Sequence, residues 1–110
     1  MILLITLRAS KHLRMKHLRE LHNSEKQISA SLLATLNEGK AIALSIKKSA
    51  KLKEHITHEP AVLICLEGKA LFGDELENNY LLGPGNYVNI PENVVHWVEG
   101  VEDASLVLIK

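Results

Sequence analysis

Residues 83–97, GPGNYVNIPENVVHW, hold two tight-turn signals, a short strand between them, and a histidine in the apolar strand that follows. The turns are Gly-Pro-Gly at 83–85 and Pro-Glu-Asn at 91–93, because these residue types favour turn conformations. Alternation along the next strand puts His96 on the same face as Val98. A histidine among core side chains needs partners for its two ring nitrogens, either hydrogen bonds, a ligand or a metal. The segment therefore predicts β-structure with a pocket at His96.

The chain after residue 26 repeats this pattern of short apolar segments separated by turns. NEGK at residues 37–40 predicts a hairpin between two alternating strands. AVLICL at 61–66 does not alternate, so both of its faces are expected to be covered. Eight or nine strands are expected, over residues 28–36, 41–46, 51–59, 61–66, 69–72, 77–82, 86–90, 94–100 and 104–110. The number and spacing of these strands, without a helical pattern, predict an all-β sandwich or barrel.

The segment KLKEHITHE, at residues 51–59, carries two more histidines. Strict alternation puts Leu52 and Ile56 on one face. His55 and Thr57 fall on the other face, together with two lysines. His58 then lies opposite His55, unless a bend before the following proline resets the alternation.

Composition describes an ordinary single domain. Of the 110 residues, 46% are hydrophobic and 24% charged, with 13 basic and 13 acidic side chains. The equal totals conceal an uneven distribution, because basic residues are concentrated in residues 1–20. Residues 21–110 carry eight basic and twelve acidic residues, a net charge of −4. By charge, nucleic acid is therefore not an expected partner. Cys65 is the single cysteine, which excludes an intramolecular disulfide and favours a reducing compartment.

The first residues predict neither export nor membrane insertion. MILLITL precedes the basic residues, which reverses the order of a secretory signal, and it is too short to span a bilayer. We therefore expect a cytoplasmic protein without a membrane partner. Met15 is a plausible start, so residues 1–14 are interpreted as an upstream initiation, within an N-terminal extension of residues 1–26. His12, His17 and His22 recur every five residues, which prevents them from sharing a helical face as metal ligands.

At this point the residues resemble a known family, the cupins, and in particular the small single-domain RmlC-like members. The second cupin motif has a glycine, five residues, Pro-x-Gly, two residues, a histidine, three residues and an asparagine. Here Gly85, Pro91 and His96 match, whereas Asn93 stands for the second glycine and Gly100 for the asparagine. The resemblance covers residues 28–110. It implies a double-stranded β-helix, or jelly-roll barrel, over residues 27–110.

The first cupin motif is more degenerate. Its end resembles Leu66-Glu67-Gly68, and counting back places its first histidine on His55. Its second histidine falls on Thr57 and its glutamate on Ala61. The family binds a divalent metal through three histidines and a glutamate, so the resemblance implies a site for Zn, Fe, Mn or Ni at His55 and His96. His58 is the candidate for a third ligand.

Three functional interpretations remain open. The first is a barrel that binds a small molecule at His96 and His55 without turnover, with or without a divalent metal. The second is a metal-dependent enzyme similar to the family's dioxygenases or isomerases. In the third, His96 is a hydrogen-bonded core residue and His55 is solvated. The two missing family ligands favour the binding protein over the enzyme.

A second copy of the chain is the expected macromolecular partner. A jelly roll leaves edge strands open, and the resemblance to small cupins implies a homodimer. The segment 28–36 is the candidate interface, because Leu33 interrupts its polar face.

Overall fold

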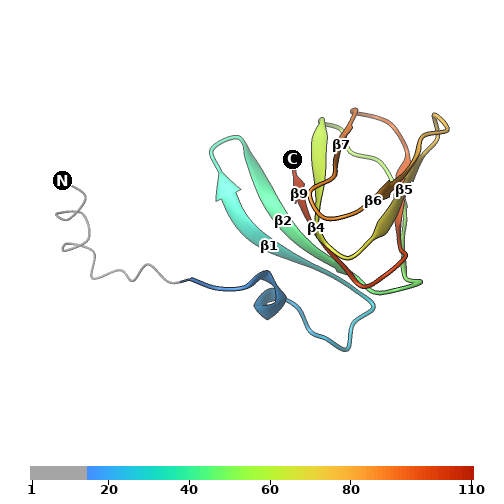
Figure 1. The fold of residues 1–110 in the computed structure, drawn as a ribbon. Coiled ribbons are helices and arrows are strands. Elements are labelled where there is room, and N and C mark those ends of the chain that lie inside the picture. The colour runs from blue at the N-terminus through green and yellow to red at the C-terminus, as the bar shows by residue number, and fades with distance from the viewer. Residues whose placement is uncertain (1–14) are drawn as a thin grey trace.

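The computed structural model describes residues 15–110. The predicted upstream start and His12 lie outside the described residues. In the described part, one short 3-10 helix precedes nine strands (Figure 1). Their bounds are η1 (Leu18–Leu21), β1 (Ile28–Leu36), β2 (Gly39–Ile46), β3 (Lys51–His55), β4 (Ala61–Glu67), β5 (Ala70–Asp74), β6 (Asn79–Leu82), β7 (Tyr87–Ile90), β8 (His96–Gly100) and β9 (Ala104–Ile109). The prediction of an all-β chain is confirmed.

The strands form two antiparallel sheets. One has the order β1-β2-β9-β4-β7 and the other the order β3-β8-β5-β6. Strand β9, the last in the chain, lies between β2 and β4, and β8 lies between β3 and β5. The two sheets therefore interleave segments from both halves of the chain, which is the arrangement of a jelly roll.

The core fills the space between the sheets. Its fully buried side chains come from both sheets and include Leu106 and Cys65 at 0% exposure and Phe72 at 3%. Burial raises the pKa of the Cys65 thiol, so this cysteine packs as a small apolar side chain. Strand β4 lies inside its sheet, between β9 and β7, but the prediction that both of its faces are covered is met only in part. Burial alternates along the strand, and Leu66 is 41% exposed.

The face assignment predicted for β3 is wrong, because the strand contains a bulge. The register of β3 on β8 shifts between Leu52 and His55. Leu52 packs against the core and His55 contacts the buried His96, so the two residues share the inner face. Ile56 is 43% exposed, whereas Thr57 is buried. An extra residue in one strand reverses the alternation beyond it, which a strict period of two cannot represent.

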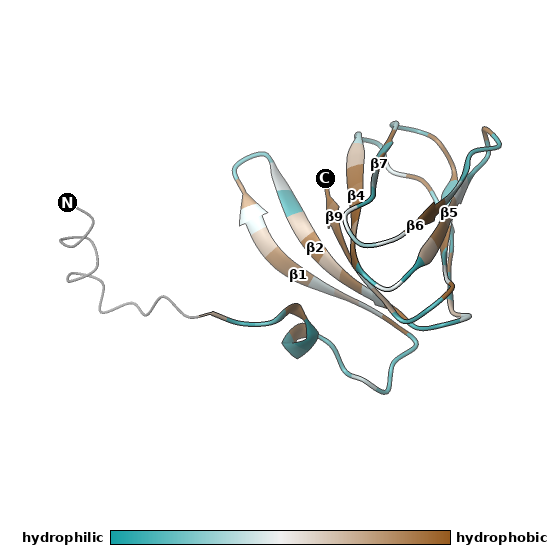
Figure 2. Cartoon of the chain, viewed as in Figure 1, coloured by the Kyte–Doolittle hydropathy of each residue, from teal (hydrophilic) through white to brown (hydrophobic). Residues whose placement is uncertain are grey.

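Strand β1 is an edge strand that pairs only with β2. In Figures 1 and 2 the β1–β2 hairpin extends away from the closed barrel, and it carries apolar residues along its length. Three leucine side chains of β1 are exposed to solvent, with Leu32 at 56%, Leu33 at 43% and Leu36 at 55% exposure. In residues 15–110, helices are too short to cross a membrane.

Candidate functional site

The site is built around two facing histidines on neighbouring strands. His55 ends β3 and His96 begins β8, and their Cα atoms are register partners. Their ring centroids are 4.1 Å apart with the rings at 63°, an edge-to-face contact. His96 is 2% exposed, and Phe72 stacks on its ring with the centroids 6.0 Å apart. The structure thus brings together the two histidines that the sequence predicted, and His55 is not simply solvated.

Main-chain carbonyls determine which ring nitrogens remain available. His55 Nδ1 lies 3.0 Å from the carbonyl oxygen of Lys53, and His96 Nδ1 lies 3.1 Å from that of Val94. A carbonyl oxygen only accepts, so each Nδ1 must donate its proton. In a neutral imidazole the lone pair is then on Nε2, which can accept a hydrogen bond or bind a metal. The same local contact, two residues back in the chain, orients both rings.

Burial keeps His96 neutral. Desolvation lowers the pKa of His96, and the hydrogen bond to Val94 and the charge of Asp74 only partly oppose it. The neighbouring His55 and the charge of Lys110 lower this pKa further. His96 is therefore an uncharged acceptor or ligand at neutral pH.

Asp74 is the register partner of His96 on the other side, in β5, and it is buried. Its Oδ1 accepts hydrogen bonds from the backbone nitrogens of Leu76 and Asn78, and its Oδ2 accepts one from the Asn78 side chain. Burial alone raises the pKa of Asp74, but these hydrogen bonds outweigh it and the net shift is downward. The carboxylate therefore holds the β5–β6 turn, and three of its about four acceptor positions are already used.

His58 does not join the histidine pair. Its Nδ1 lies 3.2 Å from Asn93 Oδ1, and its side chain is exposed. Within residues 15–110 no group of three or more His, Cys, Asp or Glu side chains is arranged to hold a metal ion. The metal assignment of His55, His96 and His58 stays a prediction, with only two of the three side chains adjacent.

Asn93 occupies the place of the family's second glycine for a conformational reason. Its φ is 60°, in the left-handed region that glycine adopts freely and asparagine adopts more readily than most other residues. Its backbone nitrogen donates to the Thr57 carbonyl at 2.7 Å. This substitution therefore preserves the turn that carries the chain into β8.

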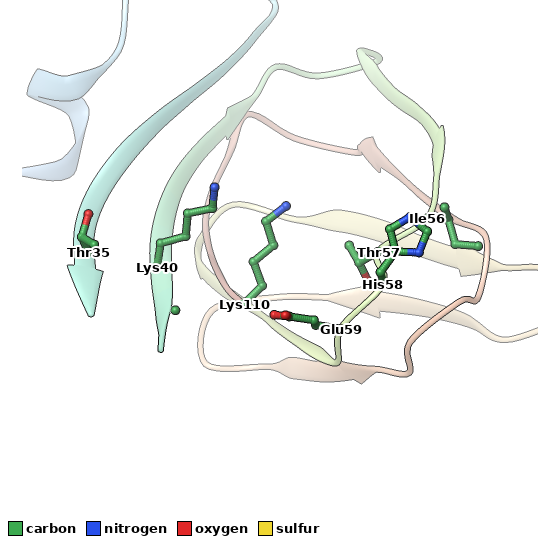
Figure 3. Close-up of a pocket in the computed structure, with 8 residues that line it drawn as sticks. Thr35, Lys40, Ile56, Thr57, His58, Glu59 and Lys110 are labelled. Carbon is green, nitrogen blue, oxygen red and sulfur yellow. The ribbon is translucent and has the colours of Figure 1, made fainter. Parts of the chain in front are cut away.

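A cavity of about 480 Å³ opens beside β3, between the β1–β2 hairpin tip and the loop that follows His55 (Figure 3). Its lining comprises Thr35, Gly39, Lys40, Ile56, Thr57, His58, Glu59 and Lys110. Lys40 and Lys110 are far apart in the chain and belong to no motif, so the sequence alone does not predict that they meet. Only the pairing of β2 with β9 brings them together, as neighbours that exchange backbone hydrogen bonds of 2.7 and 3.0 Å.

Thr57 stands where the cupin motif has its second histidine, and it faces this cavity. The residue is 7% exposed, and its Oγ1 is buried without a hydrogen-bond partner within the described part of the chain. A buried hydroxyl without a partner costs free energy, so a group that hydrogen-bonds to it would be favoured in the cavity.

Comparisons with known proteins support the fold. No family model and no curated protein matches the sequence. A conserved protein of unknown function from Streptococcus pyogenes is 18% identical, covering 90% of this chain and 87% of that one, with a TM-score of 0.76. A cupin superfamily protein from Desulfitobacterium hafniense is 16% identical over 91% and 94% of the two chains, also with a TM-score of 0.76.

An RmlC-like cupin with a double-stranded β-helix fold, from Methanocaldococcus jannaschii, shares that architecture. It is 14% identical over 81% of this chain and 84% of that one, with a TM-score of 0.69. At such identities the likeness defines the fold alone, and it confirms the predicted double-stranded β-helix.

Proposed function

Starting from a chain with the cupin fold, we propose that this protein is a binding barrel, which holds a small molecule at His55 and His96 and in the adjoining cavity. The observation that carries this proposal is the orientation of the two rings. Both Nδ1 atoms are hydrogen-bonded to main-chain carbonyls, which leaves Nε2 of each ring to meet a ligand. Ring orientation fixed before binding reduces the entropy that a ligand must offset.

Each residue has a definite role in this binding. His96 is neutral and accepts a hydrogen bond from a hydroxyl or amide group of the ligand, and His55 offers a second acceptor next to it. Phe72, stacked on His96, supplies an apolar wall. The cavity is lined by Ile56 and Thr57, which directly follow His55 in the chain, whereas His55 and His96 themselves are not among its lining residues. In this proposal the ligand reaches the histidine pair from the cavity, past Thr57. Mostly apolar walls with a few oriented polar groups are typical of small-molecule sites.

A divalent metal is the second candidate occupant, and the same ring orientation favours it. Metal-binding histidines commonly donate their other ring proton to a carbonyl or carboxylate. His55 and His96 fit two positions of a Zn, Fe, Mn or Ni site, but the remaining family ligands are Thr57 and Ala61 here. When bound, such a metal would polarise an oxygen-rich molecule as a Lewis acid. The incomplete ligand set favours the binding protein over a metal enzyme.

The first experiment is native mass spectrometry with elemental analysis, on protein purified without a histidine tag or chelator. We expect a copurifying small molecule with wild type and with His17→Ala, which removes an exposed histidine outside the cavity lining. We expect its loss with His96→Gln, which retains side-chain volume. Circular dichroism verifies that the variants fold. Near-stoichiometric metal that disappears in His96→Gln would replace this proposal with the metal enzyme. Equal ligand retention by wild type and His96→Gln would exclude the histidine pair as the binding site.

A further inference from the structure

Two lysine side chains enter the cavity from one side. Lys40 lies near the start of β2, and Lys110 follows β9. Their backbones pair in both directions, because Lys40 N donates to Lys110 O and Lys110 N donates to Lys40 O. In Figure 3 the two lysine side chains run side by side, and both ammonium groups point the same way, away from Glu59. A rigid pair of strands thus presents two positive charges at one position.

Within residues 15–110, neither ammonium group forms an ion pair with a carboxylate. The ion pairs among residues 15–110 are His17–Glu67, Lys47–Asp103 and Lys69–Glu102, and they do not involve Lys40 or Lys110. Glu59 also lines the cavity, but in Figure 3 its carboxylate points toward the backbone end of Lys110. The cavity therefore carries more positive than negative charge at the lysine tips. The charge of Lys110 also reaches the interior, since it lowers the pKa of His96.

The opposite wall offers a neutral hydrogen-bond donor. Thr57 Oγ1 is buried without a partner in the described residues, and Thr57 lines the cavity together with His58. A threonine hydroxyl can donate a hydrogen bond to an oxygen anion. A cation could use the same hydroxyl only as an acceptor, and it would be repelled by the two lysine ammonium groups. The lysine wall and the threonine wall of the cavity thus both favour a negatively charged ligand.

We propose that this cavity recognises a small oxygen anion, a carboxylate or phosphate group, held between Lys40 and Lys110 on one side and the Thr57 hydroxyl on the other. This inference rests on the proposed function, because it names the chemical class of the small molecule that the barrel is proposed to bind. Charge-assisted hydrogen bonds from the two ammonium groups supply the affinity. The rest of the ligand extends toward His55 and His96.

The test is an NMR titration of amide nitrogen–proton pairs with two probes, malonate and inorganic phosphate, at constant ionic strength. We expect saturable shifts at the amides of Lys40, Thr57 and Lys110, and none with the neutral analogue malonamide. Lys40→Met and Lys110→Met should each weaken binding of the better probe about tenfold. Lys48→Met is the matched control, since it removes one exposed lysine outside the cavity and should leave the affinity unchanged.

Three results would overturn the anion site: equal weakening by Lys48→Met, equal binding of malonamide, or shifts that follow ionic strength alone. Thr57→Val should weaken binding severalfold yet raise the midpoint of thermal unfolding, because the unpartnered hydroxyl is removed. Unchanged affinity in Thr57→Val would remove the hydroxyl from the site. His96→Gln separates the two proposals: anion binding that survives in this variant supports the lysine site even where the histidine pair proves empty.

Discussion

Strands β9 and β1 pair with opposite edges of the same strand, β2, yet their burial is very different. Leu44 of β2 lies opposite Leu106 of β9 on one side and Ala30 of β1 on the other. Leu106 is 0% exposed, whereas Ala30 is exposed and its neighbour Leu32 is 56% exposed. Both strands have an apolar face, but only β9 lies inside the sheet. Alternation thus identifies the apolar face of a strand without indicating what covers it.

The largest expected effect is on the stability of the core. Leu106→Ala should lower the free energy of unfolding by about 3 kcal/mol, because it leaves a cavity in a closed part of the barrel. Leu32→Ala should cost less than about 1 kcal/mol in dilute protein, because its side chain is already hydrated. Urea unfolding followed by tryptophan fluorescence measures both. Similar losses for the two variants would contradict the difference between the strands.

The second effect is on association rather than folding. We propose that a second copy of the chain covers β1, because an exposed antiparallel edge with open leucines can pair with its own copy. Light scattering after gel filtration should give twice the chain mass for wild type and the monomer mass for Leu32→Glu. Leu76→Glu is the matched control, since Leu76 is 60% exposed in the turn after β5 and should leave the dimer intact. A wild-type monomer would exclude this interface.

Most of the fold could be predicted because strand alternation and turn chemistry are local properties. Eight or nine strands were expected and nine are observed in the described chain, with differences mainly at their ends. The turn at Asn93 needed only a residue that tolerates a positive φ. His96 could be identified as a candidate site residue because a polar side chain in an apolar strand is expected to be buried and to need a hydrogen-bond partner or a ligand.

The site was only partly predictable because its remaining features depend on pairing between distant segments. The bulge between Leu52 and His55 exists only in the register with β8, and it moves His55 to the inner face. Lys40 and Lys110 meet through β2 and β9, and neither has a sequence signal of its own. The unpartnered hydroxyl of Thr57 is likewise a property of the packed structure.

The smallest expected effect is the pH dependence of stability, to which two histidines contribute: His96 in the barrel and His22, which lies between η1 and the edge strand β1. Burial lowers the pKa of His96 from its ordinary value of 6.5, and burial also lowers that of His22. The unfolded chain therefore binds more protons than the folded one as the pH falls below about 6.5. Stability should be flat with respect to these groups above pH 7 and decrease toward pH 5, with a slope of at most about 1.4 kcal/mol per pH unit for each histidine.

His96→Gln should reduce this slope and leave the part that belongs to His22. Urea midpoints at several pH values between 5 and 8 provide the measurement. An unchanged slope in His96→Gln would mean that the His96 ring takes up its proton as easily in the folded chain as in the unfolded one. That result would be incompatible with a neutral ring enclosed between Phe72 and His55, and it would place His96 in the open part of the molecule together with β1.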